Sequence, residues 1–132
     1  MRLRQQRRSA NSRPELQPVA VLKIINLEEG LPSVASASSR LLGELRRARD
    51  EKCAAVKVIH GYGSHGVGGE LRIAIQGLLA RMEQSGEIAA FVAGEEWRIS
   101  NEAAWRLIQR HRELKQDRDL GKGNKGISIV VL

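Results

Sequence analysis

Cysteine is nearly absent from this sequence, which contains one, Cys53, among 132 residues. A single thiol excludes an internal disulfide framework and any zinc ribbon, and it fits a reducing compartment. The sequence also lacks a run of roughly 20 apolar residues, the length needed to span a bilayer. Its first residues lack the apolar stretch of a secretory signal. We therefore expect a cytoplasmic protein that has no membrane partner.

Aromatic residues are equally scarce. The sequence has two tryptophans, one tyrosine and one phenylalanine, too few for the aromatic-rich sheet of an RNA-recognition fold. Positive charge, in contrast, is abundant, because the formal net charge is +7 and the pI is near 10.3. A basic balance of this size favours an anionic partner, and DNA or RNA is the leading choice. The alternative is a protein whose charge serves only to keep it in solution.

The positive charge is concentrated at the start of the chain. Residues 1–18 hold five arginines and one glutamate, a net charge of +4, and the other 114 residues supply the remaining +3. This segment is polar, has no hydrophobic period, and closes with Pro14 and Pro18. We interpret it as a disordered basic arm that contacts phosphates without reading sequence, or else as a solvated tail with no partner. Residues 19–132 are predicted to form one domain.

Hydrophobic periodicity divides this domain into alternating strands and helices. Short apolar runs predict strands, and apolar stripes with helical spacing predict helices, the first of them capped by Ser33. The alternation of strand, helix and strand implies parallel pairing through right-handed crossovers. The last run is apolar throughout, so we expect it inside the sheet with both faces covered. The predicted strands are 19–25, 54–60, 88–94 and 127–132, and the predicted helices are 33–51, 69–85 and 101–120.

A glycine-rich loop separates the second strand from the second helix. The stretch "VKVIHGYGSHGVGGELR", residues 56–72, places five glycines between the two elements. Amides at a helix start carry partial positive charge, and glycines let an anion approach them closely. "GYGSHG" matches G-x-G-x-x-G, but the chain has room for hardly more than one half of a dinucleotide-binding fold. No Lys-Ser or Lys-Thr follows, which excludes a nucleotide-triphosphate P-loop. The alternative is a plain connection whose glycines adopt positive φ.

The stretch "VKVIHGYGSHGVGGELRIAIQGLL" resembles the second signature of the Smr (small MutS-related) domain, which is an apolar strand, a His-Gly-x-Gly turn, further glycines and a Leu-Arg that opens a helix. The resemblance covers 19–94 and 121–132. It implies an α/β (α+β) two-layer sandwich of the form βαβαββ with a four-stranded mixed sheet, similar to the C-terminal domain of translation initiation factor three. In that fold both helices cover one face, and the last strand lies between the second and third, antiparallel to them.

The sequence departs from the family where a first signature, Leu-Asp-x-His-Gly, should end the first strand. The matching stretch is "LKIIN", residues 22–26, with Lys23 and Ile25 in place of the aspartate and the histidine. In members with nuclease activity those two residues are linked to phosphodiester cleavage, and lysine and isoleucine cannot replace them as metal ligands or proton carriers. The catalytic residues are therefore unknown and no metal is expected. Only a nuclease that uses Glu28 or Glu29 instead would need Mg²⁺ or Mn²⁺.

A second departure is the segment of about 95–120, where the family usually has a short glycine-rich loop. This chain inserts a helix there. Between residues 101 and 120, five Lys and Arg face four Asp and Glu, which argues against a dedicated basic stripe. The inserted helix packs on the domain, extends a nucleic-acid surface or binds a protein partner.

These observations predict an Smr-like domain that binds the phosphate backbone of DNA or RNA in a structure-selective way, without strong nuclease activity. The alternatives are a metal-dependent Smr-type endonuclease and a protein-interaction module that uses the inserted helix. Tyr62 either stacks on a base or covers the end of the sheet, and His60 either orients the turn or touches phosphate. Oligomeric state stays open. The predicted nucleic-acid-binding residues are Lys57, His60, Gly61, Tyr62, Gly63, His65, Gly66, Gly68, Gly69 and Arg72.

Overall fold

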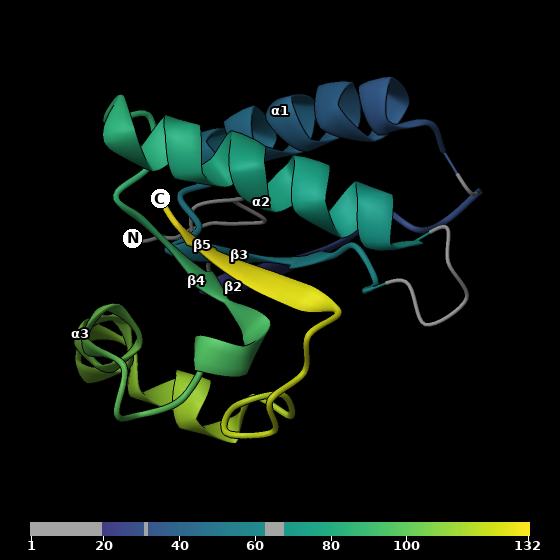
Figure 1. Cartoon of the computed structure of the whole chain (residues 1–132). Coiled ribbons are helices and arrows are strands. Elements are labelled where there is room, and N and C mark those ends of the chain that lie inside the picture. The colour runs from purple at the N-terminus through teal and green to yellow at the C-terminus, as the bar shows by residue number, and fades with distance from the viewer. Residues whose placement is uncertain (1–19, 31, 63–67) are drawn as a thin grey trace, which may run out of the picture.

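The computed structural model describes residues 20–30, 32–62 and 68–132. The predicted basic arm and three residues of the predicted binding set, Gly63, His65 and Gly66, therefore lie outside the described residues. The described part forms one sheet with helical layers on both faces (Figure 1). The sheet contains β2 (Leu22–Asn26), β3 (Ala55–Ile59), β4 (Ala90–Ala93) and β5 (Ile127–Val131) in the order β2-β3-β5-β4.

The pairing of the strands confirms the predicted mixed sheet. β2 and β3 are parallel, with Leu22 opposite Ala55. β5 runs antiparallel to both β3 and β4, so that Val131 pairs with Ala55 on one side and with Ala90 on the other. All five residues of β5 are buried, as expected for an apolar strand in the interior of a sheet that is covered on both faces.

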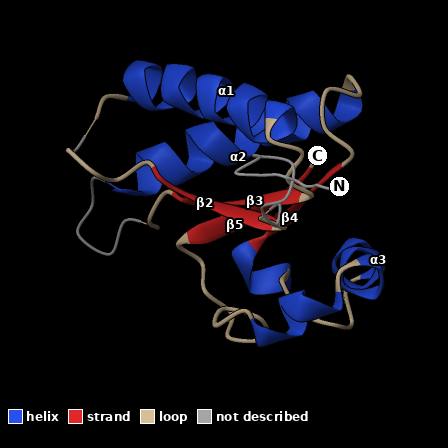
Figure 2. Ribbon diagram, turned by 180° about the vertical axis from the view of Figure 1, so that it is seen from behind, coloured by secondary structure: helices blue, strands red, loops and turns tan. Residues whose placement is uncertain are grey.

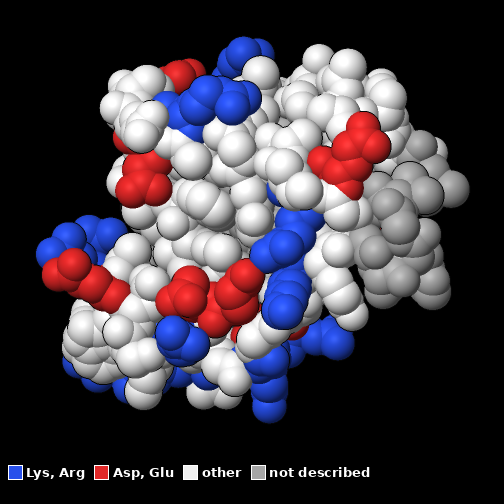
Figure 3. All heavy atoms as spheres, viewed as in Figure 1, with Lys and Arg blue, Asp and Glu red and all other residues white. Residues whose placement is uncertain are grey.

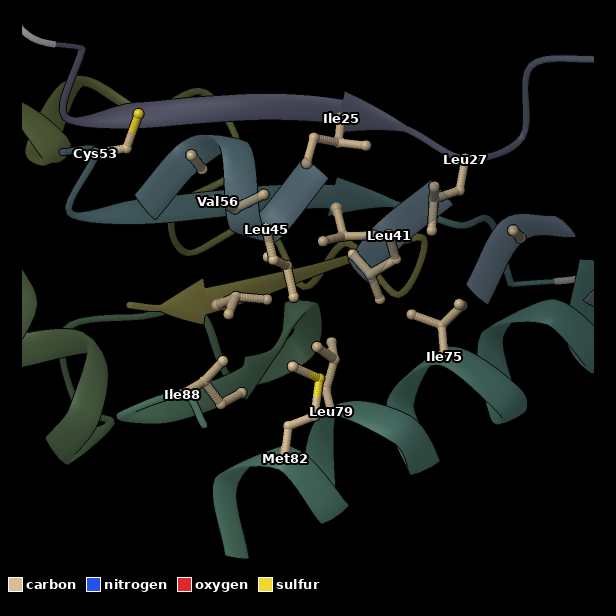
Figure 4. Packing of buried hydrophobic residues seen from close by; sticks show 14 of the residues in the cluster. Ile25, Leu27, Leu41, Leu45, Cys53, Val56, Ile75, Leu79, Met82 and Ile88 are labelled. Carbon is tan, nitrogen blue, oxygen red and sulfur yellow. The ribbon is translucent and has the colours of Figure 1, made fainter. Parts of the chain in front are cut away.

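Two long helices cover one face of the sheet, as predicted: α1 (Val34–Asp50) and α2 (Gly68–Gln84). Ser33 caps α1, because its side chain accepts a hydrogen bond from the Ser36 amide at 3.1 Å. Figure 4 shows Leu41 and Leu45 of α1 and Ile75 and Leu79 of α2 packed between the helices and the strands. The buried cluster consists of Ile25, Leu27, Ala37, Leu41, Leu45, Ala48, Cys53, Val56, Val58, Leu71, Ile75, Leu79, Met82, Ile88 and Val130.

The inserted segment covers the opposite face. It consists of η3 (Gly94–Glu96), α3 (Glu102–Arg110) and η4 (Arg112–Gln116), and Figure 2 shows α3 across the sheet from α1 and α2. The predicted single helix over 101–120 is wrong in extent, because α3 ends where the His111 backbone turns to φ −137°. No described helix is long and apolar enough to cross a membrane. The second buried cluster consists of Ala55, Val92, Trp97, Ala104, Leu107, Ile108, Leu114, Ile127, Ile129 and Val131.

A buried ion cluster fastens the insert to the sheet. Lys57 of β3 is 2% exposed, and its Nζ lies 2.7 Å from Asp117 Oδ1 and 2.6 Å from Asp119 Oδ2. Trp97 Nε1 donates to the other oxygen of Asp117 at 2.9 Å, and Asn124 donates to Asp119 at 3.0 Å. The expectation that Lys57 faces a nucleic-acid backbone is therefore corrected, because its ammonium is enclosed by the insert.

Replacing Lys57 by methionine should destabilise the protein by about 3–5 kcal/mol, because two largely buried carboxylates lose their counter-charge. Urea unfolding followed by circular dichroism measures the effect. Lys23→Met is the matched control. Lys23 Nζ pairs with Glu51 at 2.9 Å but is partly exposed, at 22%, and the loss of such a pair costs at most about 1 kcal/mol. Equal losses in the two variants would show that the Lys57 cluster does not hold the insert.

Candidate functional site

The glycine turn lies at one edge of the sheet. β3 ends there at Ile59, β5 begins there at Ile127, and these two residues are paired. α2 begins at Gly68 on the same side (Figure 1). The sequence "HGYG" thus follows the last paired residue of β3, and the segment 121–126 leads directly into β5. The fold brings together two glycine-rich segments that are far apart in the sequence.

Gly126 holds the turn in place. Its carbonyl oxygen accepts hydrogen bonds from the His60 amide at 2.9 Å and from the Gly61 amide at 3.0 Å. Gly61 has φ +74°, a conformation that costs glycine little and other residues more. These two amides are already satisfied within the protein, so they are not free to cradle a phosphate. The expectation that Gly61 supplies such a contact is therefore corrected.

A carboxylate also occupies the space beside Gly61. A Cβ built on Gly61 would lie 2.9 Å from Glu28 Cδ, so the exposed Glu28 side chain packs against the turn. Its negative charge opposes a phosphate at that point. Close packing and positive φ together account for glycine at this position.

His60 is a buried structural residue. Its side chain is fully buried, with Nδ1 2.6 Å from the Gly61 carbonyl oxygen and Nε2 2.9 Å from Ser128 Oγ. A carbonyl only accepts, so Nδ1 carries the proton and Nε2 accepts from the Ser128 hydroxyl. Gln76 Nε2 donates to the same hydroxyl at 3.2 Å. Of the two predicted roles for His60, the geometry supports orientation of the turn. Contact with phosphate is not possible here, because both ring nitrogens are bonded within the protein and the ring is buried.

Burial lowers the pKa of His60, and the nearby Arg72 guanidinium lowers it further, against the opposing hydrogen bond to Gly61 and charge of Glu95. The imidazole is therefore neutral at neutral pH. A serine beside a neutral histidine has the chemistry of a nucleophile and its base. Ser128 is nevertheless fully buried, so its hydroxyl cannot reach a substrate in this structure.

Arg72 forms an ion pair across to the insert. Its Nη2 lies 2.8 Å from Glu95 Oε2, and the two side chains are 26% and 33% exposed. Its Nε and the other carboxylate oxygen, Glu95 Oε1, are buried without a hydrogen-bond partner among the described residues. Arg72 thus lies close to the turn, with its charge largely balanced by Glu95.

Exposed groups do occur at this edge. Tyr62 is 52% exposed, and the aromatic ring lies close to Gly126, whose added Cβ would be 3.7 Å from Tyr62 Cδ1. Lys122 and Lys125 are exposed in the segment that ends at Gly126. Neither lysine belongs to the predicted binding set, although two cations among glycines are a visible signal in the sequence.

Two further residues of the predicted binding set, Gly68 and Gly69, lie at the start of α2. In the first turn of this helix, Glu70 adds an acidic side chain.

The surface charge does not mark out a binding face. Figure 3 shows basic and acidic side chains intermixed on the face seen in Figure 1, without a large patch of either charge. Among the described residues, no three His, Cys, Asp or Glu side chains form a group that could hold a metal ion.

The residues at the first family signature have structural roles. Ile25 is 3% exposed and belongs to the core beneath the long helices. Lys23 pairs with Glu51 at 2.9 Å and with Glu44 at 3.8 Å, both near the last turns of α1. Neither position offers a group that could act on phosphorus.

Comparison with known proteins identifies the fold. No protein-family model matches the sequence, and no curated protein matches it. The crystal structure of the Smr domain of Thermus thermophilus MutS2 is similar, with 24% sequence identity and a TM-score of 0.51. The similarity covers 83% of this chain and 96% of that chain. The protein therefore has an Smr-like fold, as its second signature predicted.

The buried, neutral His60 should make stability depend on pH. Its pKa is lowered from the usual 6.5 in the folded state, so the unfolded chain binds a proton first as the pH falls. The free energy of unfolding should decrease from about pH 7.5 to about pH 5.5, where carboxylates are still ionised. In His60→Gln this decrease should be smaller. Urea unfolding at several pH values measures it, and an unchanged pH dependence in the variant would contradict a neutral His60.

Proposed function

We propose that this chain, which has the Smr-like fold, is a nucleic-acid-binding domain without strong nuclease activity. The observation that carries the proposal is the combination of that fold with the "HGYG" turn at the end of β3. The resemblance of this turn to the second Smr signature implies contact with nucleic acid. A formal net charge of +7 supports the same anionic partner, because phosphate contacts supply most non-specific affinity.

The contacts would be made at the edge of the sheet where the turn lies. Tyr62, Arg72 and the amides of Gly68 and Gly69 remain from the predicted set among the described residues. Lys57, His60 and Gly61 are left out, since their polar groups are enclosed or already bonded. Binding of this kind depends on the shape of the backbone rather than on base sequence.

The geometry gives little support to an endonuclease. A metal-dependent mechanism needs oxygen or nitrogen ligands that converge on one ion, whereas Lys23 and Ile25 serve ion pairing and core packing. Glu28 is the carboxylate beside the turn. An alternative, Mg²⁺- or Mn²⁺-dependent cleavage would therefore rest on Glu28 or on its neighbour Glu29.

A second candidate function is protein binding through the insert. Trp105 of α3 is 39% exposed and Ile99, just before that helix, is 60% exposed. Exposed tryptophan is common where proteins bind one another. If the chain bound no nucleic acid at any salt concentration, this function would become the leading one.

Binding should be electrostatic and should weaken steeply with salt. Replacing the five arginines of residues 1–18 by glutamine should lower affinity for single-stranded, duplex and branched oligonucleotides alike, because contacts to phosphate alone carry no preference. The slope of log affinity against log salt should become shallower by about 0.9 for each arginine that contacts duplex DNA. Fluorescence anisotropy over a salt series measures both effects. Complete loss of binding would instead show that the domain itself contributes no site.

Cleavage should be at most a trace. Supercoiled plasmid and single-stranded RNA incubated with the protein and Mg²⁺ or Mn²⁺ should stay intact on gels, because the first family signature is absent. Glu28→Gln and Glu29→Gln are the variants that examine the alternative. Strong metal-dependent cleavage that disappears in either variant would overturn the proposal and favour an endonuclease.

A further inference from the structure

An exposed tyrosine meets the end of a segment that carries two exposed lysines, residues 121–126, at one edge of the sheet. The Tyr62 side chain is 52% exposed and lies against Gly126. Lys125 precedes Gly126, so its Cα is about 3.8 Å from that of Gly126. Lys122 lies three residues further back, between Gly121 and Gly123, both with positive φ. An aromatic ring and two cations are thus presented by two segments far apart in the sequence.

The segment that carries these lysines is held by specific hydrogen bonds. Asn124 donates from Nδ2 to Asp119 at 3.0 Å, and its Oδ1 accepts from the Gly126 amide at 2.8 Å. Asp119 in turn accepts from the buried Lys57 at 2.6 Å. Gly126 completes the chain of contacts by accepting from the turn amides of His60 and Gly61. The buried ion cluster therefore fixes the lysine segment relative to Tyr62.

The two sides of the turn carry opposite charges. Glu28 lies against Gly61 on the β2 side of the turn, and the lysine segment leads into β5 on the other side. A polyanion that approached Tyr62 would be repelled by the carboxylate and attracted by the lysines. These charges favour a path for a bound polyanion along the segment 121–126 and away from Glu28.

We infer that Tyr62, Lys122 and Lys125 form a binding site for an unpaired nucleotide, in which the ring stacks on a base while the lysines contact the flanking phosphates. The inference rests on the proposed function and names its preferred ligand class, single-stranded nucleic acid. Stacking needs an exposed face of a base, which a duplex hides between its neighbouring pairs. Stacking is also tolerant of base identity, since every base has a π-face.

The test compares a single-stranded oligonucleotide with the blunt duplex of the same sequence by fluorescence anisotropy. Tyr62→Leu should lower single-strand affinity by about 5- to 150-fold, the usual range for loss of one stacked base. It should leave duplex affinity nearly unchanged. Tyr62→Phe is the matched control, because it retains the ring, and it should bind both ligands as the parent does. Tyr62 is exposed at the turn, so the core is untouched by either change.

The lysines are examined separately. Lys122→Gln with Lys125→Gln should make the salt slope for the single strand shallower by up to about 1.4, at about 0.7 for each phosphate contact. Lys115→Gln, an exposed lysine in η4, is the control and should leave the slope unchanged. An oligonucleotide with an abasic tract, which keeps its phosphates, should bind the parent about as weakly as the intact strand binds Tyr62→Leu.

The outcomes separate this inference from the proposed function. If the parent binds single strands and Tyr62→Leu binds them equally well, the stacking site is refuted while nucleic-acid binding stands. Equal losses on single strand and duplex would also refute it, because the ring would then serve the fold of the turn. If the parent binds neither ligand at low salt, the proposed function fails and the inference fails with it.

Discussion

One buried ammonium group, that of Lys57, joins the central sheet to the inserted segment. Lys57 is in the middle of a strand whose other residues are apolar, and its side chain is only 3% exposed. A charge in such surroundings is tolerated only with close counter-charges, and both come from the insert, 60 and 62 residues later in the chain. Trp97 adds a hydrogen bond to one of the carboxylates. The insert is therefore a structural part of the domain, since it completes the burial of one sheet face.

The same network reaches the edge where the candidate site lies. Asp119 links Lys57 to Asn124, and Asn124 holds Gly126. The groups that this edge can offer to a ligand are those that have no hydrogen bond within this network. The amides of His60 and Gly61 are used internally. What remains exposed is a tyrosine on the turn and lysines on the neighbouring segment, a combination suited to a strand with unpaired bases.

Local patterns predicted most of the fold and less of the site. Helical stripes located α1 and α2, and the wholly apolar "ISIVVL" predicted an interior strand, because these patterns report burial directly. Within α1, residue type alone misjudges burial, because Ala37 is buried and Leu42 is 39% exposed. The roles of Lys57 and Gly61 could not be predicted, since their partners Asp117 and Glu28 are distant in sequence. Only the folded chain shows that Lys57 is neutralised and that Gly61 is packed against a carboxylate.

The central place of β5 also bears on how the molecule is made. β5 follows all the other described elements in the chain, yet it separates β3 from β4. Until it arrives, both of those strands present unpaired backbone groups along an open edge, and such edges favour association between chains. β5 also brings Gly126, whose carbonyl holds the turn after β3. The sheet and the turn after β3 can therefore be completed only once β5 has been made, and a chaperone that shields open strand edges would act before that point.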